Sequence, residues 1–458
     1  MDIDETKIYD FEKDFAVETI KILQELVKID TTNPPGNEVK AAEWIYDLLS
    51  KEGIDAEVIE SAPGRGNVIS RLKGKSSAPS LLLLSHLDVV PSQDLEKWEV
   101  PPFSGELKDG YIWGRGSLDD KGTTAPQLMT YIRLYREGFK PQGDIVFAAT
   151  ADEESGGYFG PGWLVKNKFD MIKADNVITE GGGQLLPIKT KTPNYVIQIS
   201  EKGMFWTKIR TRGDAGHGSM PGPSENMAIV KMMKVVEKIA KYKPPIIVQD
   251  LIKETVKAMD LPAAALTKRI FTSKRLIKLG VWIAKKVMKE EIDNILYPLV
   301  QNKITPTVLR AGEKENNIPG LCEATLDARL LSGFDRTDLY KELEKILGKK
   351  LFKEVELESI LDQPGGLTPT GTDFYLKIEE TIGNLDPGAK LVPFLSPGST
   401  DMLHFRRKGI KAYGFVPMKM GDLSAKDLSA MPHGYNERLS IDNLMFATRF
   451  FYDLALKY

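Results

Sequence analysis

The sequence predicts an α/β protein in which a smaller α+β domain is inserted into a layered domain with a mostly parallel central sheet. Three observations support this prediction. The chain has 458 residues, enough for two compact domains. Its first part alternates short apolar runs with helical patterns, as do parallel strands that are buried on both faces. Near residue 195 the pattern changes to strands of alternating polarity, and the first pattern resumes near residue 366.

The elements of the first part follow from the spacing of apolar residues. Phe15, Ile20 and Leu23 recur at helical spacing, which predicts a helix over 12–29 that ends before Pro34 and Pro35. The same reasoning predicts helices at about 38–52, 121–137 and 161–167, and strands at 67–72, 81–84, 144–150 and 176–179.

The middle of the chain has a different pattern. Two alternating strands are predicted on either side of Glu201-Lys202-Gly203. They are followed by a helix at about 224–241, a strand at 322–330, a helix at about 336–347 and a strand at 355–360; strands at 390–394 and 410–416 and a helix at about 441–457 then complete the chain. We therefore predict a first part (1–195), an inserted domain (196–362) and a second part (363–458).

Within the inserted domain, residues 249–303 form a predicted helical insertion. Its stretch from 268 to 289 carries eight cations and no acids, interleaved with apolar residues. A basic amphipathic segment of this kind can lie on a membrane surface or hold an acidic or acyl partner. The alternative is a solvated face over a small helical core. We favour the solvated face, because the whole chain has almost no net charge.

Composition excludes several classes of protein. There are 62 Lys and Arg residues and 64 Asp and Glu residues, a net charge of −2, so we expect no nucleic-acid partner. The single cysteine, Cys322, cannot form an intrachain disulfide or a cysteine metal site, so any metal must bind His, Asp and Glu. The acidic N-terminus lacks the pattern of a secretory signal, and no apolar run approaches the roughly 20 residues that cross a bilayer. We therefore expect a cytoplasmic protein.

His86 and Asp88 directly follow the predicted strand at 81–84. Open α/β sheets bind their ligands at the carboxyl ends of such strands. Two residues apart on an extended backbone, the two side chains point the same way. A single histidine in this place is more often a core residue than a metal ligand, so the interpretation depends on what surrounds it.

Acidic residues end three further segments. Asp119 and Asp120 lie in a glycine-rich turn that enters a helix, where an aspartate is also an ordinary N-cap. Glu153 and Glu154 follow the next predicted strand, and Glu180 follows the strand after that. If these acids converge beside the histidine, something must offset their repulsion, because unpaired like charges packed together are costly. A pair of divalent ions would do so.

Two histidines and three carboxylates, one of them bridging, suit a dinuclear zinc centre that keeps an open position for water. Glu153 and Glu154 are adjacent, so one side chain can bind metal while its neighbour faces the water as a general base. This arrangement is typical of a hydrolase.

Seven short motifs occur in a fixed order along nearly the whole chain: TTNPPGNE, SHLDVVP, WEVPPFSGELKDGYIWGRGSLDDKG, ADEESGG, AGHGSMP, NNIPGLCEATLDARLL and HGYNE. With them the chain resembles the dinuclear zinc family of aminoacylases, acetylornithine deacetylases, succinyl-diaminopimelate desuccinylases, carnosinase-like dipeptidases and Gly-Xaa carboxypeptidases. The resemblance implies a zinc-exopeptidase-like catalytic domain with an inserted lid or dimerisation domain.

The resemblance also implies a ligand set. One metal ion would be bound by His86 and Glu180, and the other by Glu154 and His433, with Asp119 bridging both. The ions would be two Zn²⁺, and the same oxygen and nitrogen ligands accept Co²⁺ or Mn²⁺.

Further roles follow from the same resemblance. Glu153 would be the general base, and Asp88 would orient the imidazole of His86. Asp119 is preferred to Asp120 as the bridging ligand because the family ligand stands two residues before a Lys-Gly pair. Asp120 would then be a cap or a surface acid.

Three residues of the inserted domain are similar to family residues that contact the substrate. His217 would polarise the scissile carbonyl, in relatives from the partner subunit. Asn316 and Arg329 would bind the substrate's carbonyl and carboxylate, since the planar guanidinium fork suits a carboxylate. The alternative for Arg329 is an ion pair with a nearby acid such as Asp327.

One motif departs from the family. The usual Gly-Thr-Asp-x-Arg element is here Ser399-Thr400-Asp401-Met402-Leu403, so leucine replaces the arginine. This puts in doubt how a free α-carboxylate is held there. His404, beside it, is interpreted as structural, with a cationic contact as the alternative. Ser399 and Thr400 are still expected to line the substrate pocket.

Together these observations predict a metallohydrolase that cleaves an amide or peptide bond of an N-acyl amino acid or short peptide. We expect a homodimer, because His217 otherwise reaches the metals only by hinge closure within one chain. One alternative is a catalytically silent metal-binding or assembly protein on the same fold. A two-metal phosphoesterase is a second, but it should carry a cluster of Arg or Lys near the ligands.

Overall fold

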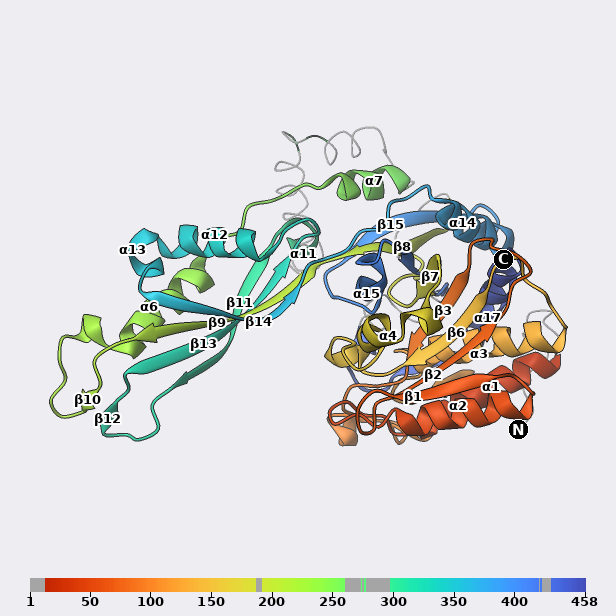
Figure 1. Ribbon diagram of the computed structural model, residues 1–458, viewed down its shortest axis with the longest axis horizontal. Coiled ribbons are helices and arrows are strands. Elements are labelled where there is room, and N and C mark those ends of the chain that lie inside the picture. Colours follow the sequence, from red (N-terminus) through yellow and green to blue (C-terminus); the bar gives the residue numbers. More distant parts are fainter. Residues whose placement is uncertain are drawn as a thin grey trace.

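The computed structural model describes residues 13–186, 192–259, 273, 276, 297–419, 421 and 430–458. These residues form two parts, which we call the body and the lid (Figure 1). The body contains an eight-stranded sheet between two layers of helices, and the lid contains a four-stranded antiparallel sheet with helices on one side. This is the α/β fold with an inserted α+β domain that the sequence predicts, so the predicted fold class is confirmed.

The first part of the body runs to the end of β8. Its helices are α1 (Lys13–Lys28), α2 (Val39–Lys51), α3 (Lys121–Arg136), α4 (Pro161–Asn167) and α5 (Phe169–Ile172). Its strands are β1 (Ala56–Glu60), β2 (Gly66–Leu72), β3 (Leu81–His86), β4 (Glu106–Lys108), β5 (Tyr111–Trp113), β6 (Ile145–Thr150), β7 (Asn176–Thr179) and β8 (Asn194–Glu201).

The chain returns to the body after the lid. The elements there are α14 (Asp373–Leu385), β15 (Lys390–Ser396), α15 (Met402–Arg406), β16 (Lys411–Gly414), β17 (Arg438–Ser440) and α17 (Ile441–Ala455). The large sheet has the order β1-β2-β6-β3-β7-β16-β8-β15. Its centre, from β6 through β3 and β7 to β16, is parallel, and β8 pairs in parallel with β15.

The body sheet is buried on both faces because its strands are continuous apolar runs. In β3, Leu81 and Leu83 pack into the core formed with α1, α2, α3, α14 and α17. Leu82 and Leu84 point to the opposite face, where α4, α5 and α15 cover the sheet. Alternate residues of a strand serve opposite faces, so a run of four leucines fills both cores at once. The carboxyl ends of the parallel strands are thereby fixed at one edge.

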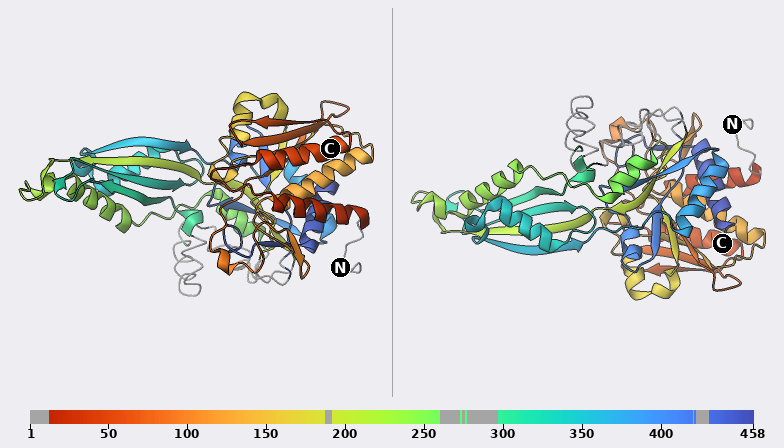
Figure 2. Two further views of the ribbon diagram at one scale, coloured as in Figure 1. Left: turned by 90° about the horizontal axis from the view of Figure 1, so that it is seen from below. Right: turned by 90° about the horizontal axis from the view of Figure 1, so that it is seen from above.

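The lid consists of β9 (Gly203–Arg212), β10 (Gly216–His217), α6 (Ala228–Lys241), β11 (Lys303–Ala311), β12 (Asn317–Ile318), β13 (Leu321–Leu330), α12 (Arg336–Leu347), α13 (Lys349–Phe352) and β14 (Val355–Gln363). Its main sheet has the order β11-β13-β9-β14. The lid projects from one side of the body, with β10 and β12 at its far end (Figures 1 and 2).

The lid begins later than the sequence suggests. Residues 196–201 belong to β8, which pairs with β15 of the body, so the chain leaves the body after Glu201 and not at residue 196. The alternating pattern of β8 matches that of the lid strands, and its parallel partner lies about 195 residues later in the chain. Pairing over that separation is not visible in a local pattern.

Helices α7 (Asp250–Ala258) and α11 (Tyr297–Val300) stand at the two ends of the predicted helical insertion. The basic stretch 268–289, apart from residues 273 and 276, lies outside the described residues. Among the residues that are described, none of the helices combines the length and apolar character needed to span a bilayer.

Candidate metal centre

The structure brings all five predicted ligands together at one edge of the body sheet. His86 is the last residue of β3, Glu154 follows β6, and Glu180 follows β7. These three strands are parallel neighbours, so their carboxyl ends meet at the same edge. Asp119 comes from the turn that enters α3, and His433 from the segment before β17.

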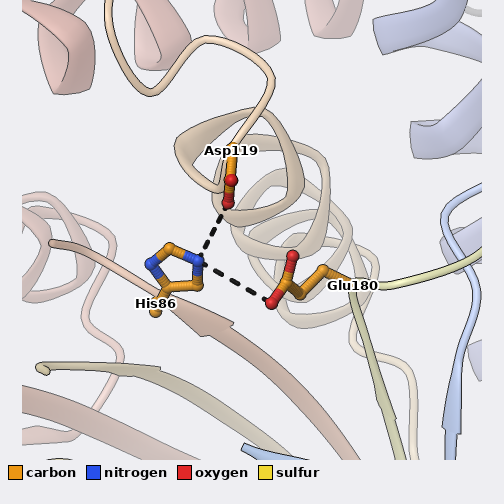
Figure 3. A group of neighbouring side chains, drawn as sticks. All are labelled: His86, Asp119 and Glu180. Carbon is orange, nitrogen blue, oxygen red and sulfur yellow. Dashed lines mark hydrogen bonds and ion pairs between the residues drawn. The ribbon is translucent and has the colours of Figure 1, made fainter. Parts of the chain in front are cut away.

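Asp119 stands between two groups of ligand atoms. Its Oδ1 lies 3.2 Å from His86 Nε2, which in turn lies 3.9 Å from Glu180 Oε1 (Figure 3). Its Oδ2 lies 3.4 Å from His433 Nε2, which lies 3.2 Å from Glu154 Oε2. Within each group the ligand atoms lie within 4.8 Å of one another. One carboxylate thus faces two triads with different oxygens, as a bridging ligand does.

The carboxylates of the cluster repel one another, and bound cations would offset this repulsion. Burial, together with the charges of Asp119 and Asp120, raises the pKa of Glu180 well above its usual value. Hydrogen bonds to Asp119 and Glu154 raise the pKa of His433 to about 10. In the described part of the chain, Glu154 Oε1 is buried without a hydrogen-bond partner. The imidazole and carboxylate donors therefore fit two divalent ions.

Glu153, the predicted base, sits on the single helical turn that also carries Glu154. It lines the cavity between the body and the lid together with Glu154 and His433. Burial and the nearby charge of Glu180 raise the pKa of Glu153 well above its usual value. A carboxyl group with a raised pKa beside a ligand cluster is suited to accept and return a proton.

Asp88 does more than the predicted orientation of His86. The nearest group to His86 Nδ1 is the backbone oxygen of Asp88, at 3.0 Å, and the Asp88 carboxylate lies 3.4 Å away. That carboxylate also accepts hydrogen bonds from the backbone amides of Glu153, at 3.0 Å, and Glu154, at 3.1 Å. Asp88 therefore holds both the histidine and the turn that carries the base.

Glu437 is a functional residue that the sequence analysis did not identify. Its fully buried carboxylate accepts hydrogen bonds from the backbone amides of Gly116, Leu118 and Asp119 at 2.8–3.0 Å. It also pairs with buried Arg115, at 2.6 Å, whose guanidinium donates to the backbone oxygen of Gly434. Glu437 thus fixes the bridging aspartate and links it to the segment of the other histidine. Its place in the HGYNE motif was the available signal.

A second buried group behind the site was also missed. Asn33 Nδ2 donates to Asp88 Oδ2 at 2.8 Å, and Arg65 Nη2 donates to Asn33 Oδ1 at 2.9 Å. Arg65 also pairs with Glu38 at 2.5 Å and with Asp152 at 3.0 Å. This network connects the TTNPPGNE motif to Asp88 and explains why Asn33 and Glu38 are buried.

Asp120 is not the surface acid that we expected as one possibility. Only 1% of it is exposed, and its Oδ2 accepts a hydrogen bond from the backbone amide of His86 at 3.1 Å. It occupies the N-cap position of α3. Burial raises its pKa to about 7. Asp120 therefore positions the backbone of a ligand and stays outside both ligand triads.

The predicted substrate residues divide into two sets. Arg329, Ser399 and Thr400 line the cavity of about 660 Å³ between the body and the lid, which we call the interdomain cavity. Arg329 makes the ion pair with Asp327 that we considered as the alternative, at 2.8 and 3.2 Å. It still lines the cavity, so the ion pair does not remove it from the site.

The segment that departs from the family is held by other groups. Leu403, in place of the usual arginine, is buried and lines the interdomain cavity. Nearby Arg406 is also buried, but it pairs with Glu201 at 2.9 Å and does not replace the missing cation. Burial lowers the pKa of His404 to about 4, so this histidine is neutral near pH 7 and structural. The lowered pKa favours the structural interpretation over a cationic contact.

His217 and Asn316 do not join the metal centre of their own chain. His217 is exposed in β10, which pairs with β12 beside Asn316. This small sheet forms the end of the lid farthest from the body (Figure 1). The two residues are close to each other, since Gly218 donates to the backbone oxygen of Asn316 at 2.8 Å. They form a second group of predicted site residues at the tip of the lid.

Comparison with known proteins assigns the family. Residues 82–457, most of the chain, match the peptidase family M20/M25/M40. The chain belongs to this family. It is therefore a member of a group of hydrolases that act on carbon–nitrogen bonds, and the resemblance seen in the sequence is confirmed.

Relatives of this M20 chain have several activities. It is 29% identical over 386 residues to a probable carboxypeptidase S-like 2 of Dictyostelium discoideum, covering 82% of this chain and 71% of the relative. It is also 29% identical to the N-fatty-acyl-amino acid synthase/hydrolase PM20D1 of Xenopus tropicalis, covering 81% and 71%. Among solved structures, the M20 family metallo-carboxypeptidase Sso-CP2 of Sulfolobus solfataricus has a TM-score of 0.71 at 18% identity, covering 96% and 98%.

Proposed function

We propose that this M20 protein uses two zinc ions to hydrolyse the amide or peptide bond of an N-acyl amino acid or short peptide. The observation that carries the proposal is the bridging position of Asp119 between two ligand triads, with Glu153 beside them. The names of the relatives support the substrate class, since they include a carboxypeptidase and an N-fatty-acyl-amino acid hydrolase. The cytoplasmic location stays a prediction.

The interdomain cavity supports a substrate with a free carboxylate. Arg329 is the cation that its lid wall contributes, and Ser399 and Thr400 lie on the body side. Thr400 is fixed there because its amide and hydroxyl both donate to Glu201 Oε2, at 3.0 and 3.1 Å. Asp327 already accepts hydrogen bonds from Nε and Nη2 of Arg329, at 2.8 and 3.2 Å, so a substrate carboxylate would bind on the Nη1 side of the guanidinium. The amino-acid half of the substrate would therefore lie between the metal centre and the lid.

When bound, the metal ions polarise the scissile carbonyl and lower the pKa of the attacking water. Glu153 takes a proton from that water as its oxygen bonds to the carbonyl carbon. The same carboxyl group returns the proton to the nitrogen as the carbon–nitrogen bond breaks. The products are a carboxylic acid and a free amine, and Asp88 keeps Glu153 in place by accepting its backbone amide.

We also propose that the working form is a homodimer in which the tip of one lid completes the site of the other chain. Strand β10, which contains His217, and strand β12, which directly follows Asn316, lie at the end of the lid away from the body (Figure 1). Strand β11 is at the edge of the lid sheet and exposes Val308 and Leu309, with exposed fractions of 40% and 59%. An exposed apolar edge strand is a natural pairing surface. His217 would then donate a hydrogen bond to the carbonyl oxygen as it gains charge.

The direct test is a panel of N-acyl amino acids and dipeptides, assayed with metal-free protein and with protein reloaded with zinc. We expect hydrolysis of at least one of the two substrate classes that depends on added metal. Hydrolysis of phosphate esters instead would favour the phosphoesterase. Bound zinc without turnover of any compound would favour the catalytically silent alternative.

A further inference from the structure

A second cavity adjoins the metal centre and shares no lining residue with the interdomain cavity. It has a volume of about 160 Å³ and includes Asp119 and Glu180 in its wall. We call it the apolar pocket, because polar side chains are the minority of the remaining wall: Asp120, Thr123, Gln184 and Asn443. The other wall residues are Gly122, Gly181 and Gly182 and seven with apolar side chains: Leu118, Val416, Pro417, Met418, Pro432, Leu439 and Ala447. Of these seven apolar residues, Leu118 is the one that lies in a motif of the resemblance, and none of the seven was predicted to contact the substrate.

The walls of the two cavities contain different residues of the predicted ligand set. The apolar pocket touches it at Asp119 and Glu180, whereas the interdomain cavity touches it at Glu154 and His433. A carbonyl carbon at the metal centre carries two substituents that diverge from it. If the amino-acid half points to Arg329 in the interdomain cavity, the acyl half points to the apolar pocket.

The wall of the apolar pocket is held in place by the backbone. Val416 and Met418 donate hydrogen bonds to the backbone oxygens of Gly182, at 3.0 Å, and Gly183, at 2.9 Å. A Cβ at Gly183 would lie 1.8 Å from the backbone oxygen of Val416, so only glycine allows this approach. Asn443 lines the pocket, but its side chain accepts from and donates to the backbone of Lys419 at 2.8 and 3.0 Å. The pocket is thus largely pre-formed, as small-molecule sites usually are.

We propose that the apolar pocket binds the acyl side of the scissile bond and selects a compact apolar group, such as a branched aliphatic chain or a single phenyl ring. This inference rests on the proposed function and specifies its substrate. The size limit follows from the volume, because an apolar cavity of about 150 Å³ accommodates one benzene molecule. A long linear acyl chain exceeds this volume. One methylene more or less in such a pocket changes kcat/KM by about 10–200-fold.

The test uses zinc-loaded full-length protein and one amino acid with a series of acyl groups: acetyl, butanoyl, isovaleryl, benzoyl and dodecanoyl. For the wild type we expect kcat/KM to be highest for isovaleryl or benzoyl and to fall at least tenfold for acetyl and dodecanoyl. Met418→Ala enlarges the pocket and should move the optimum toward larger groups. Ala447→Leu narrows the pocket and should move it toward acetyl.

Met233→Ala is the matched control, since Met233 is 63% exposed on α6 of the lid and should leave the profile unchanged. The inference is overturned if Met418→Ala, correctly folded, has the wild-type acyl profile.

Binding of acetate, isovalerate and phenylacetate, measured by calorimetry, gives a readout that does not need turnover. If the wild type cleaves none of the substrates but binds these acids in the predicted order of size, the proposed function fails and the pocket stands. If the wild type cleaves all the acyl substrates equally well, the proposed function stands and the proposed role of the apolar pocket is refuted.

Discussion

The metal centre in the body and the tip of the lid differ in one respect: the predicted residues of the metal centre lie together in one chain, whereas those at the tip of the lid do not contact them. In the body, four of the five predicted ligands are buried or half-buried, His433 is the exposed one, and the ligand atoms of each triad lie within 4.8 Å of one another. The Asp88 carboxylate holds the turn of the predicted base through two backbone amides. At the tip of the lid, His217 is exposed and its nearest polar partner is Ser219, with Nδ1 and Oγ 2.7 Å apart. The body is therefore built to act alone in binding metal. The tip of the lid has a role only if another surface meets it.

The largest expected effect comes from the base. Glu153→Ala should lower kcat by about 10²–10⁴-fold, the usual contribution of a general base. Zinc content should stay at the wild-type level, because Glu153 belongs to neither ligand triad. Metal analysis and steady-state kinetics on the same preparation measure both. Glu57→Ala, at an exposed position of β1, is the control. A variant that retains full activity would contradict the assignment.

His217→Ala should cost about 10²–10³-fold in kcat if the imidazole stabilises the developing oxyanion. The sharper experiment mixes His217→Ala chains with Glu153→Ala chains. If His217 acts across a dimer, exchange should restore about a quarter of the wild-type sites, because about half of the dimers are mixed and each of these holds one complete site. A mixture as inactive as its components would show that the tip acts within its own chain or not at all.

A smaller effect is expected at Glu437. Each of its two oxygens accepts two hydrogen bonds. In Glu437→Gln an NH2 group replaces one oxygen, and in either orientation this donor faces two other donors. We expect zinc affinity to fall about 10–100-fold, as it does when outer partners of ligands are lost. Competition with a chelator measures it, and exposed Glu99→Gln is the control. Unchanged affinity would mean that Glu437 does not position Asp119.

The smallest effect on turnover is expected at His404, which faces the interdomain cavity between the two regions. Its pKa of about 4 lies below the ordinary value of 6.5, so the folded protein holds it neutral while the unfolded chain takes up a proton. Its contribution to stability is therefore complete above pH 6.5 and is lost as the pH falls toward 4, by about 3 kcal/mol. Urea unfolding of the wild type and His404→Gln at pH 8, 6.5, 5 and 4 should show the difference in stability shrink with acid. A constant difference would contradict this.

The sequence predicted the body better than the connections around it. Apolar runs such as 81–84 end in polar residues, and parallel topology alone places those ends together, so the convergence of His86 and Glu180 followed from local pattern. The role of Glu437 did not follow from a local pattern, because the backbone amides that donate to it lie more than 300 residues away in the chain. The start of the lid was also misplaced, because β8 pairs with a strand about 195 residues later in the chain, and a local pattern does not show such a pairing. Contacts between distant segments are what the sequence could not supply.

The bridging role of Asp119 can be tested directly by counting zinc ions per chain in the wild type, His433→Ala and Asp119→Ala by mass spectrometry under native conditions. We expect two ions in the wild type, one after loss of His433, and neither ion held firmly after loss of Asp119, because Asp119 is the residue that belongs to both triads. A single ion in the wild type, or two ions retained by Asp119→Ala, would contradict it.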